Sequence, residues 1–444
     1  MKIKLLSIIV LISAVYKTTN GQPADKNKSV LNYYIFGSKT GTEKYSVMDS
    51  AGLSHYYSHV ESVYFNNINK TVSLSFSGNN RLQTSSISGS SFSWYDSSLT
   101  VNKEPEKTIM QAASEPLPVS LLGLLIRQYR WGKLSYVEMN QPSILYHGIN
   151  NIKGINENLY CYSVENLTWG HCFVWLNKNF EVRAAVCPLV YYTVYVLGNH
   201  YESAKANLEK AYARISVKVY TGKVRILNKG KISAITHVQI WDGSTDRIYK
   251  DMTIIFSQKK IISIIPAGKF KPANELIIDG TGKTIIPGLW EMHMHIRQPE
   301  WLFASLAAGV ISVRDMGNNF DYIQTLSSIS NKQGSFTPFI YKAGWIDGKS
   351  NWNFQYSGYQ ANNKEDAEKW IEKYYKGGFN QIKIWENLRK DIAESIISKA
   401  HQKGMKVVGH IPGAFSFGNI IEAGINQISH LSEIVYAYEQ DSIY

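Results

Sequence analysis

The stretch Thr284-Ile-Ile-Pro-Gly-Leu-Trp-Glu-Met-His-Met-His295 decides the fold expected for the second half of the chain. Alternate residues of a strand point to the same face, so His293 and His295 can turn both imidazoles toward one metal ion. The pair lies at the carboxyl end of a predicted strand, where (β/α) barrels carry their active sites. The alternative is a surface strand whose histidines bind nothing.

From Pro287 onward, strand patterns alternate with helix patterns. A helix is predicted from Asn363, an N-cap residue, to Lys376, before Gly377. Repeated β/α units indicate a parallel sheet and, in this number, a barrel. The strands expected after the first are 310–314, 339–343, 381–385, 405–409 and 427–429, and the other helices are 304–308, 389–403 and 417–423.

Lys383 is the second chemical signal, because it interrupts the apolar strand Gln381-Ile382-Lys383-Ile384-Trp385. Burying an ammonium group is costly unless the amine is neutral or paired. One interpretation is an uncharged amine that reacts with carbon dioxide to give a carbamate, whose two oxygens can bridge two metal ions. The other is a lysine that pairs with a carboxylate.

Two further histidines end the next predicted strands. His410 follows Lys406-Val407-Val408-Gly409, and His430 follows Gln427-Ile428-Ser429. Parallel strands end at the same rim of a sheet, so these side chains are expected near His293, His295 and Lys383. Nitrogen ligands of this kind suit zinc or a similar divalent ion.

Through these histidines and Lys383, the sequence from about Ile232 onward resembles the amidohydrolase superfamily, in its imidazolonepropionase-like and prolidase-like branch. The resemblance implies a carboxylated Lys383 that bridges two metal ions, one bound by His293 and His295 and the other by His410 and His430. It also implies that a metal-bound hydroxide attacks an amide, peptide or cyclic amide. The motifs that carry the resemblance are 284–295, Ala304–Gly317, Lys383, Gly409-His410-Ile411-Pro412 and Ile428-Ser429-His430-Leu431-Ser432-Glu433.

One departure from the family pattern concerns the general base. The family carries an Asp on its eighth strand, whereas this sequence ends at Tyr444, soon after the sixth predicted strand. Asp441 has no strand around it and does not replace that residue. The expectation is an incomplete barrel that binds metal weakly and turns over little or no substrate. The alternatives are a fragment of a longer active hydrolase, a truncated inactive homologue, or an envelope ligand-binding protein that works through its first region.

Three residues near the strand ends have open roles. Glu386, Arg314 and Asp315 could contact substrate or hold the metal ligands in position. For Arg314 and Asp315, the sequence favours pairing with each other or with residues that support the ligands. The substrate itself is not determined by the sequence.

The whole chain is expected to be a multidomain α/β protein. A signal peptide spans 1–21, and a β-rich α+β region of unknown function spans 22–214. A small β-sandwich of five strands (231–241, 251–257, 260–266, 275–279, 284–286) spans 215–286, and the incomplete barrel spans 287–444. Within the first region we expect a strand at 71–78, a hairpin from His171 to Cys187 around Asn177-Lys178-Asn179, a strand at 191–197, and helices near 117–130 and 203–215.

Composition excludes some classes of protein. Hydrophobic residues make up 44% and charged residues 18%, so the chain is not disordered throughout. The net charge of +12 is spread along the chain without a Lys/Arg run, so nucleic acid is not an expected partner. Lys2, Lys4 and the apolar run Leu5–Tyr16 predict export to the periplasm or medium, with no transmembrane anchor. The expected partner is a small-molecule or peptide substrate, and homo-oligomerisation stays open.

The three cysteines, Cys161, Cys172 and Cys187, all lie in the β-rich region. An odd number cannot form a complete set of disulfides. Cys161 and Cys172 could pair across a hairpin in an oxidising compartment, or all three could be buried apolar thiols.

Overall fold

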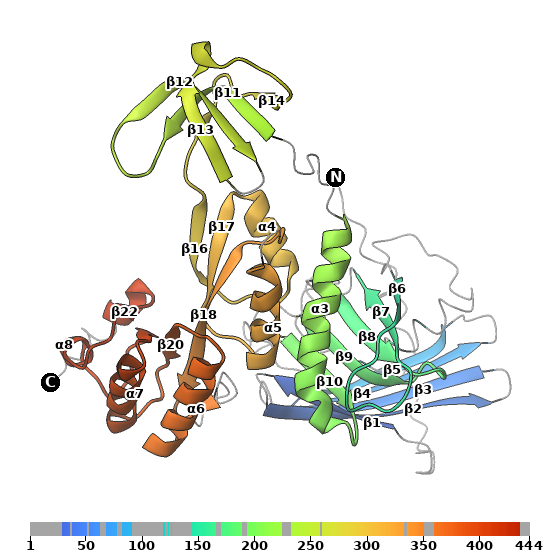
Figure 1. Ribbon diagram of the computed structural model, residues 1–444. Coiled ribbons are helices and arrows are strands. Elements are labelled where there is room, and N and C mark those ends of the chain that lie inside the picture. The colour runs from blue at the N-terminus through green and yellow to red at the C-terminus, as the bar shows by residue number, and fades with distance from the viewer. Residues whose placement is uncertain are drawn as a thin grey trace.

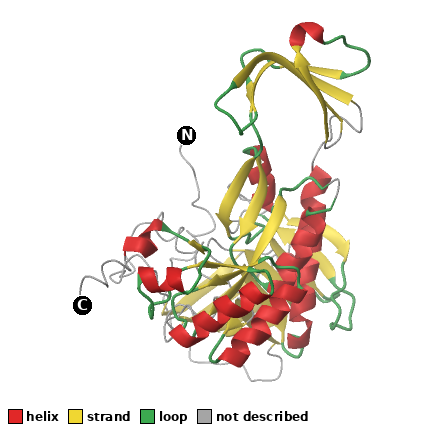
Figure 2. Ribbon diagram, turned by 60° about the vertical axis from the view of Figure 1, so that its left-hand side comes forward, coloured by secondary structure: helices red, strands yellow, loops and turns green. Residues whose placement is uncertain are grey.

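The computed structural model describes most of the chain between Ser29 and Val435. The described residues are 29–35, 38–50, 53–62, 68–77, 82–90, 144–165, 170–188, 193–223, 232–257, 260–332, 335–349 and 359–435, with Val119, Gly123 and Ile126 as single helical positions. The predicted signal peptide at 1–21 lies outside them. No helix in these ranges is long and apolar enough to cross a membrane. Figures 1 and 2 show three sheets, and α-helices lie against two of them.

The first sheet is antiparallel and makes the first region β-rich, as predicted. Its ten strands lie in the order β5-β4-β3-β2-β1-β10-β9-β8-β7-β6. The first and last strands of the region therefore meet in the middle of the sheet, where Leu31 lies opposite Gly198. The strands are β1 (Ser29–Ile35), β2 (Ser38–Ser50), β3 (Leu53–Ser62), β4 (Ile68–Ser77), β5 (Leu82–Ser90), β6 (Ile144–Ile149), β7 (Tyr160–Val164), β8 (Cys172–Leu176), β9 (Val182–Pro188) and β10 (Thr193–Gly198).

The hairpin predicted from His171 to Cys187 is confirmed as β8 and β9. The Asn177 side chain accepts hydrogen bonds from the backbone N–H groups of Asn179 and Glu181, both at 3.0 Å. The residue with a positive φ is Phe180, at 62°, rather than one of the asparagines. Asn177 closes the turn with its side chain, so the backbone reverses one residue later than the sequence suggests.

A single long helix joins the first sheet to the rest of the molecule. After a short 3-10 helix (Glu202–Ala204), α3 runs from Lys205 to Lys223, longer than predicted, so the expected boundary at residue 214 falls inside it. Tyr212 on α3 packs between Tyr195 on β10 and Tyr322 on α5 (Phe320–Ser330), with ring centroids 6.3 and 5.4 Å away. One hydrophobic core therefore continues from the first sheet into the helices of the third.

Polar contacts add to this junction beside the third sheet. Thr193 donates a buried 2.9 Å hydrogen bond to the carbonyl of Arg297, two residues beyond His295. His171 forms ion pairs with Glu165 through Nε2 and with Glu300 through Nδ1. The Thr193 bond holds the first sheet against the loop that follows the His-Met-His motif, and the Glu300 ion pair holds it against the start of the next helix.

The second sheet stands away from the other two in both views (Figures 1 and 2). The sequence places its strands almost to the residue: β11 (Ile232–Trp241), β12 (Ile248–Ser257), β13 (Lys260–Pro266), β14 (Leu276–Asp279) and β15 (Thr284–Ile285). They form one mixed sheet in the order β13-β12-β11-β14, with β15 also on β11, and no second sheet faces it among the described residues. The sandwich expected there is therefore seen only as a single layer, and Ile261 and Ile262 are exposed.

The third sheet is parallel, and α-helices connect most of its strands. The helix predicted from Asn363 is confirmed, because the Asn363 side chain accepts a hydrogen bond from the N–H of Asp366. The strands are β16 (Leu289–Met294), β17 (Val310–Asp315), β18 (Phe339–Asp347), β19 (Tyr359–Gln360), β20 (Gln381–Ile384), β21 (Lys406–Gly409) and β22 (Gln427–Ile428), and the remaining helices are α4 (Glu300–Ala307), α6 (Lys364–Lys376), α7 (Lys390–Gln402) and α8 (Phe417–Glu422).

This parallel sheet is strongly curled. Its order is β16-β17-β18-β20-β21-β22, and a flat sheet of that size would separate the outer strands by roughly 24 Å. Instead, Arg314 on β17 donates a 2.6 Å hydrogen bond to Gln427 on β22. Among the described residues β16 and β22 are not paired with each other, so the sheet forms an incomplete barrel, as predicted.

Candidate metal centre

The His-Met-His motif lies where β16 ends. The ring centroids of His293 and His295 are 5.5 Å apart. His295 Nδ1 lies 2.9 Å from the carbonyl oxygen of Gly317. A carbonyl only accepts, so Nδ1 carries the proton, and Nε2 keeps the lone pair that could bind a cation.

Asp315 at the end of β17 fixes the turn that follows this motif. Its carboxylate is fully buried and accepts the backbone N–H of Ile296 at 2.8 Å and that of Gly317 at 3.1 Å. Arg314 bonds elsewhere, to the carbonyl of Met292 at 2.6 Å and to Gln427. The two residues therefore do not pair with each other, and each holds a strand end that carries a candidate ligand.

Lys383 is fully buried on β20, and its Nζ has no hydrogen-bond partner among the residues that the structure describes. The amine faces two aromatic rings, with Nζ 4.5 Å from the centroid of Trp385 and 5.4 Å from that of Trp345. Burial lowers the pKa of Lys383 to about 7, helped by the positive charge of Arg297. No described carboxylate forms an ion pair with Lys383, so the structure does not show the carboxylate pairing that the sequence left open, and the lowered pKa favours the neutral amine.

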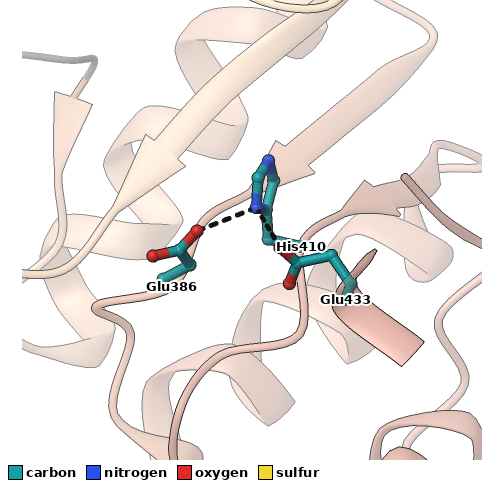
Figure 3. Close-up of side chains that lie close together, drawn as sticks. All are labelled: Glu386, His410 and Glu433. Atoms are coloured by element: carbon teal, nitrogen blue, oxygen red, sulfur yellow. Dashed lines mark hydrogen bonds and ion pairs between the residues drawn. The ribbon is translucent and has the colours of Figure 1, made fainter. Parts of the chain in front are cut away.

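His410 follows β21 and is held by two carboxylates, as Figure 3 shows. Its Nδ1 lies 3.1 Å from Glu386 Oε1 and 3.0 Å from Glu433 Oε1. Carboxylates accept, so this nitrogen also carries its proton. The opposite nitrogen, Nε2, is buried and has no hydrogen-bond partner within the described part of the chain. His410 therefore presents the same free atom as His295.

The same three residues suggest a second arrangement. Ligand atoms of Glu386, His410 and Glu433 lie within 4.8 Å of one another, close enough to hold an ion. That arrangement would need the ring proton of His410 to move from Nδ1 to Nε2. Glu433 also accepts the backbone N–H of Ile411 at 3.1 Å, as an orienting residue would. The geometry favours two carboxylates that orient His410 over a separate site.

His430 completes the group beyond β22. Its ring centroid is 4.5 Å from that of His293 and 5.1 Å from that of His410. Its backbone has a φ of 68°, a strained value for a residue with a side chain and one that often marks functional positions.

The four histidines therefore form a continuous chain of rings, and Trp385 links His410 to the amine of Lys383. The Trp385 and His410 centroids are 3.7 Å apart. Burial lowers the pKa of His293 to about 3 and also lowers those of His295 and His430, and the charge of Lys383 adds to each shift. Neutral imidazole is the form that binds metal. The structure thus brings together all five side chains that the sequence singled out.

The sequence did not reveal two supporting residues. Glu433 lies in a quoted motif, three residues after His430, yet nothing in the pattern shows that it reaches His410. Asp347 ends β18 and accepts the backbone N–H of Asn387 at 3.1 Å and its side-chain amide at 3.0 Å, which holds the loop that carries Glu386. Burial raises the pKa of Asp347 to about 6.

Comparison with known proteins gives no sequence match. No protein-family model matches the chain, and no curated protein is significantly similar to it. Solved structures are similar in part. A putative prolidase from Bifidobacterium longum is 22% identical, with a TM-score of 0.38 over 48% of this chain and 58% of that one. A bottromycin amidohydrolase is 17% identical, with a TM-score of 0.39 over 46% of this chain and 44% of that one.

A Xaa-Pro dipeptidase with methionine bound in its active site is 19% identical, with a TM-score of 0.39 over 47% of this chain and 64% of that one. The chain spans less than two thirds of the length of each of these three structures. The similarities concern the fold, so the chemistry rests on the residues described above.

Proposed function

We propose that this protein is a metal-dependent hydrolase that acts on carbon–nitrogen bonds of amides, peptides or cyclic amides. The observation that carries the proposal is the convergence of four histidine rings on one rim of the parallel sheet, next to a buried amine without a partner. Unsatisfied buried nitrogen atoms are rare in folded proteins and indicate a missing ligand.

The donor set fits divalent metal, with zinc as the first candidate. We assign one ion to His293 and His295 and a second to His410 and His430, following the family that the sequence resembles. Bound metal would supply Lewis acidity and lower the pKa of a water molecule. The chain itself contributes four imidazoles, and burial lowers the pKa values of three of them, His293, His295 and His430.

Lys383 can complete such a site after a covalent change. Its neutral amine attacks carbon dioxide, a carbon–nitrogen bond forms, and one proton leaves to the solvent. The product is a carbamate with one negative charge and two oxygen ligands. The low pKa of Lys383 supports this step, because only the uncharged amine is a nucleophile.

The carboxylates next to His410 have a positioning role in this proposal. Glu433 and Glu386 hold the proton on Nδ1 and aim Nε2 away from themselves. Such partners fix the tautomer and the orientation of a histidine ligand and increase its basicity. Glu386 is the more exposed of the two, with 54% of its side chain accessible, and could also meet the substrate.

The test combines metal analysis with turnover. The purified chain is loaded with zinc in bicarbonate buffer, desalted, and assayed on a panel of dipeptides and cyclic amides with and without a chelator. We expect bound zinc and chelator-sensitive hydrolysis, and we expect His293→Asn to lose both. His237→Asn is the matched control, because His237 is an exposed histidine on β11 that bonds to Asp251.

A second candidate is a metal-binding protein without turnover. It is favoured by the open sheet, in which β16 and β22 are not paired with each other among the described residues. Zinc bound with the expected ligands but no hydrolysis of any panel member would support this candidate. Absence of zinc binding in the unchanged chain would contradict both.

We also propose that the protein is exported to the periplasm or the medium. The support is Lys2, Lys4 and the apolar run Leu5–Tyr16, which resemble a secretory signal. N-terminal sequencing of the protein from its native host tests this. An intact Met1 on soluble cytoplasmic protein would contradict it.

A further inference from the structure

Two of the three cysteines lie opposite each other on neighbouring strands. On β8 and β9, Phe173 pairs with Val186 and Val174 with Ala185, so the same register places Cys172 opposite Cys187. Directly opposed residues of antiparallel strands have Cα atoms about 4.5 to 5.5 Å apart. Disulfides need Cα atoms about 4.4 to 6.8 Å apart, so the backbone can accept a bond here.

The two thiols also share one face of the sheet. Cys172 and Cys187 pack in the same hydrophobic cluster, between Val164 on β7 and Val194 on β10, which lie opposite them in register. The two thiols are hydrogen-bonded to each other. The strand register, the shared face of the sheet and the contact between the thiols therefore all place Cys172 next to Cys187.

Cys161 is placed differently. It lies opposite Trp175 and packs with Trp175 and Phe173 in the cluster on the other face of the sheet. The pairing of Cys161 with Cys172 that the sequence suggested is therefore wrong, because the sheet separates the two thiols. The expectation that all three thiols are buried is confirmed.

We infer that Cys172 and Cys187 form a cross-strand disulfide when the chain folds in the presence of a small-molecule disulfide such as oxidised glutathione. The thiolate of one of the two cysteines attacks one sulfur of the oxidant and releases one glutathione thiolate, while the other cysteine stays reduced. The thiolate of the other cysteine then attacks the protein sulfur of this mixed disulfide and releases the second glutathione thiolate. Two protein thiols and one glutathione disulfide give one protein disulfide and two glutathione thiols.

The timing of this reaction follows from burial. In the folded chain, the hydrogen bond with Cys172 and then burial raise the pKa of Cys187 well above its usual range, so little thiolate is available. The bond therefore forms while the hairpin is still accessible, and the finished sheet then protects it. It closes a loop of about 15 residues between two central strands and should raise the resistance of the sheet to unfolding.

The test uses the full chain, made by cell-free synthesis either in a mixture of oxidised and reduced glutathione or in excess reduced thiol. Each product is denatured without reductant, alkylated, and mapped as peptides by mass spectrometry. The oxidising mixture should leave Cys161 as the single free thiol and link the peptides that carry Cys172 and Cys187, whereas excess reduced thiol should leave all three cysteines free.

Two variants keep the result specific. Cys161→Ser should retain the link and leave no free thiol, whereas Cys172→Ala should leave two. The oxidised chain should also melt a few degrees higher than the reduced chain. Three free thiols in the oxidising mixture, or a link that includes Cys161, would overturn the inference.

Discussion

The imidazole rings of His293 and His430 lie 4.5 Å apart, centroid to centroid, although they follow the first and the last strands of the parallel sheet. Only a strongly curled sheet can bring these two residues together. The bond from Arg314 to Gln427 holds the same two sides of the sheet at 2.6 Å. The candidate centre therefore depends on the curvature of the sheet as much as on its ligands.

Glu433→Gln should weaken zinc binding about 10-fold, because the histidine loses a charged acceptor that orients its ring. Loss of such a partner costs about 10- to 100-fold in metal affinity, and we expect the smaller loss because Glu386 also accepts from His410. Isothermal titration with zinc gives the affinity. Glu422→Gln on α8, an exposed carboxylate, is the matched control, and an equal loss in both variants would contradict the assigned role.

Lys383→Met should stabilise the metal-free chain while abolishing its response to bicarbonate and zinc. A buried amine without a partner costs about 1–3 kcal/mol, and an apolar side chain of similar length removes that cost. Thermal melts in a chelator measure the first effect and metal analysis the second. Lys406→Met changes an exposed lysine on the neighbouring strand β21 and should leave both unchanged. A less stable Lys383→Met chain would show that the amine has a partner.

His171 should make stability depend on pH. Its two ion pairs, with Glu165 and Glu300, raise its pKa above 6.5 against the opposing effect of burial, and the hydroxyl of Tyr220 faces the same cluster. A raised pKa in the folded state stabilises the fold fully below pH 6.5, and this contribution is lost as the pH rises through the folded value. The melting temperature of the unchanged chain should fall over that range more steeply than that of His171→Gln. Parallel curves would refute the prediction.

Gly170→Ala should loosen the junction between the first sheet and the loop after His295. A Cβ at this position would overlap the buried side chain of Gln298 and approach Pro188. Overpacking of this kind costs about 1–3 kcal/mol. Gly222→Ala is the control, because a Cβ there meets nothing within 4 Å. Equal melting temperatures for the two variants would show that the junction absorbs the extra atom.

Local patterns in the sequence predicted most of the second and third sheets. Apart from β19, which was not predicted, the strands from β11 onward begin and end within a few residues of their predicted positions, because alternation and turn residues act over short stretches of chain. The helix α5 was also missed. The residues expected to bind metal were found in the same way, since histidine and lysine at strand ends are visible one strand at a time.

What local patterns could not show are the relationships between distant segments. The contact of His410 with Glu433, the pairing of Cys172 with Cys187, and the single helix that crosses residue 214 depend on strand register and on packing between elements. Register is set by partner strands, and the curl that joins His293 to His430 is set by the packing of helices against the sheet. These are non-local interactions, so the types of ligand and their common rim followed from the sequence, whereas the ring-to-ring distances and the carboxylate partners of His410 followed only from the folded chain.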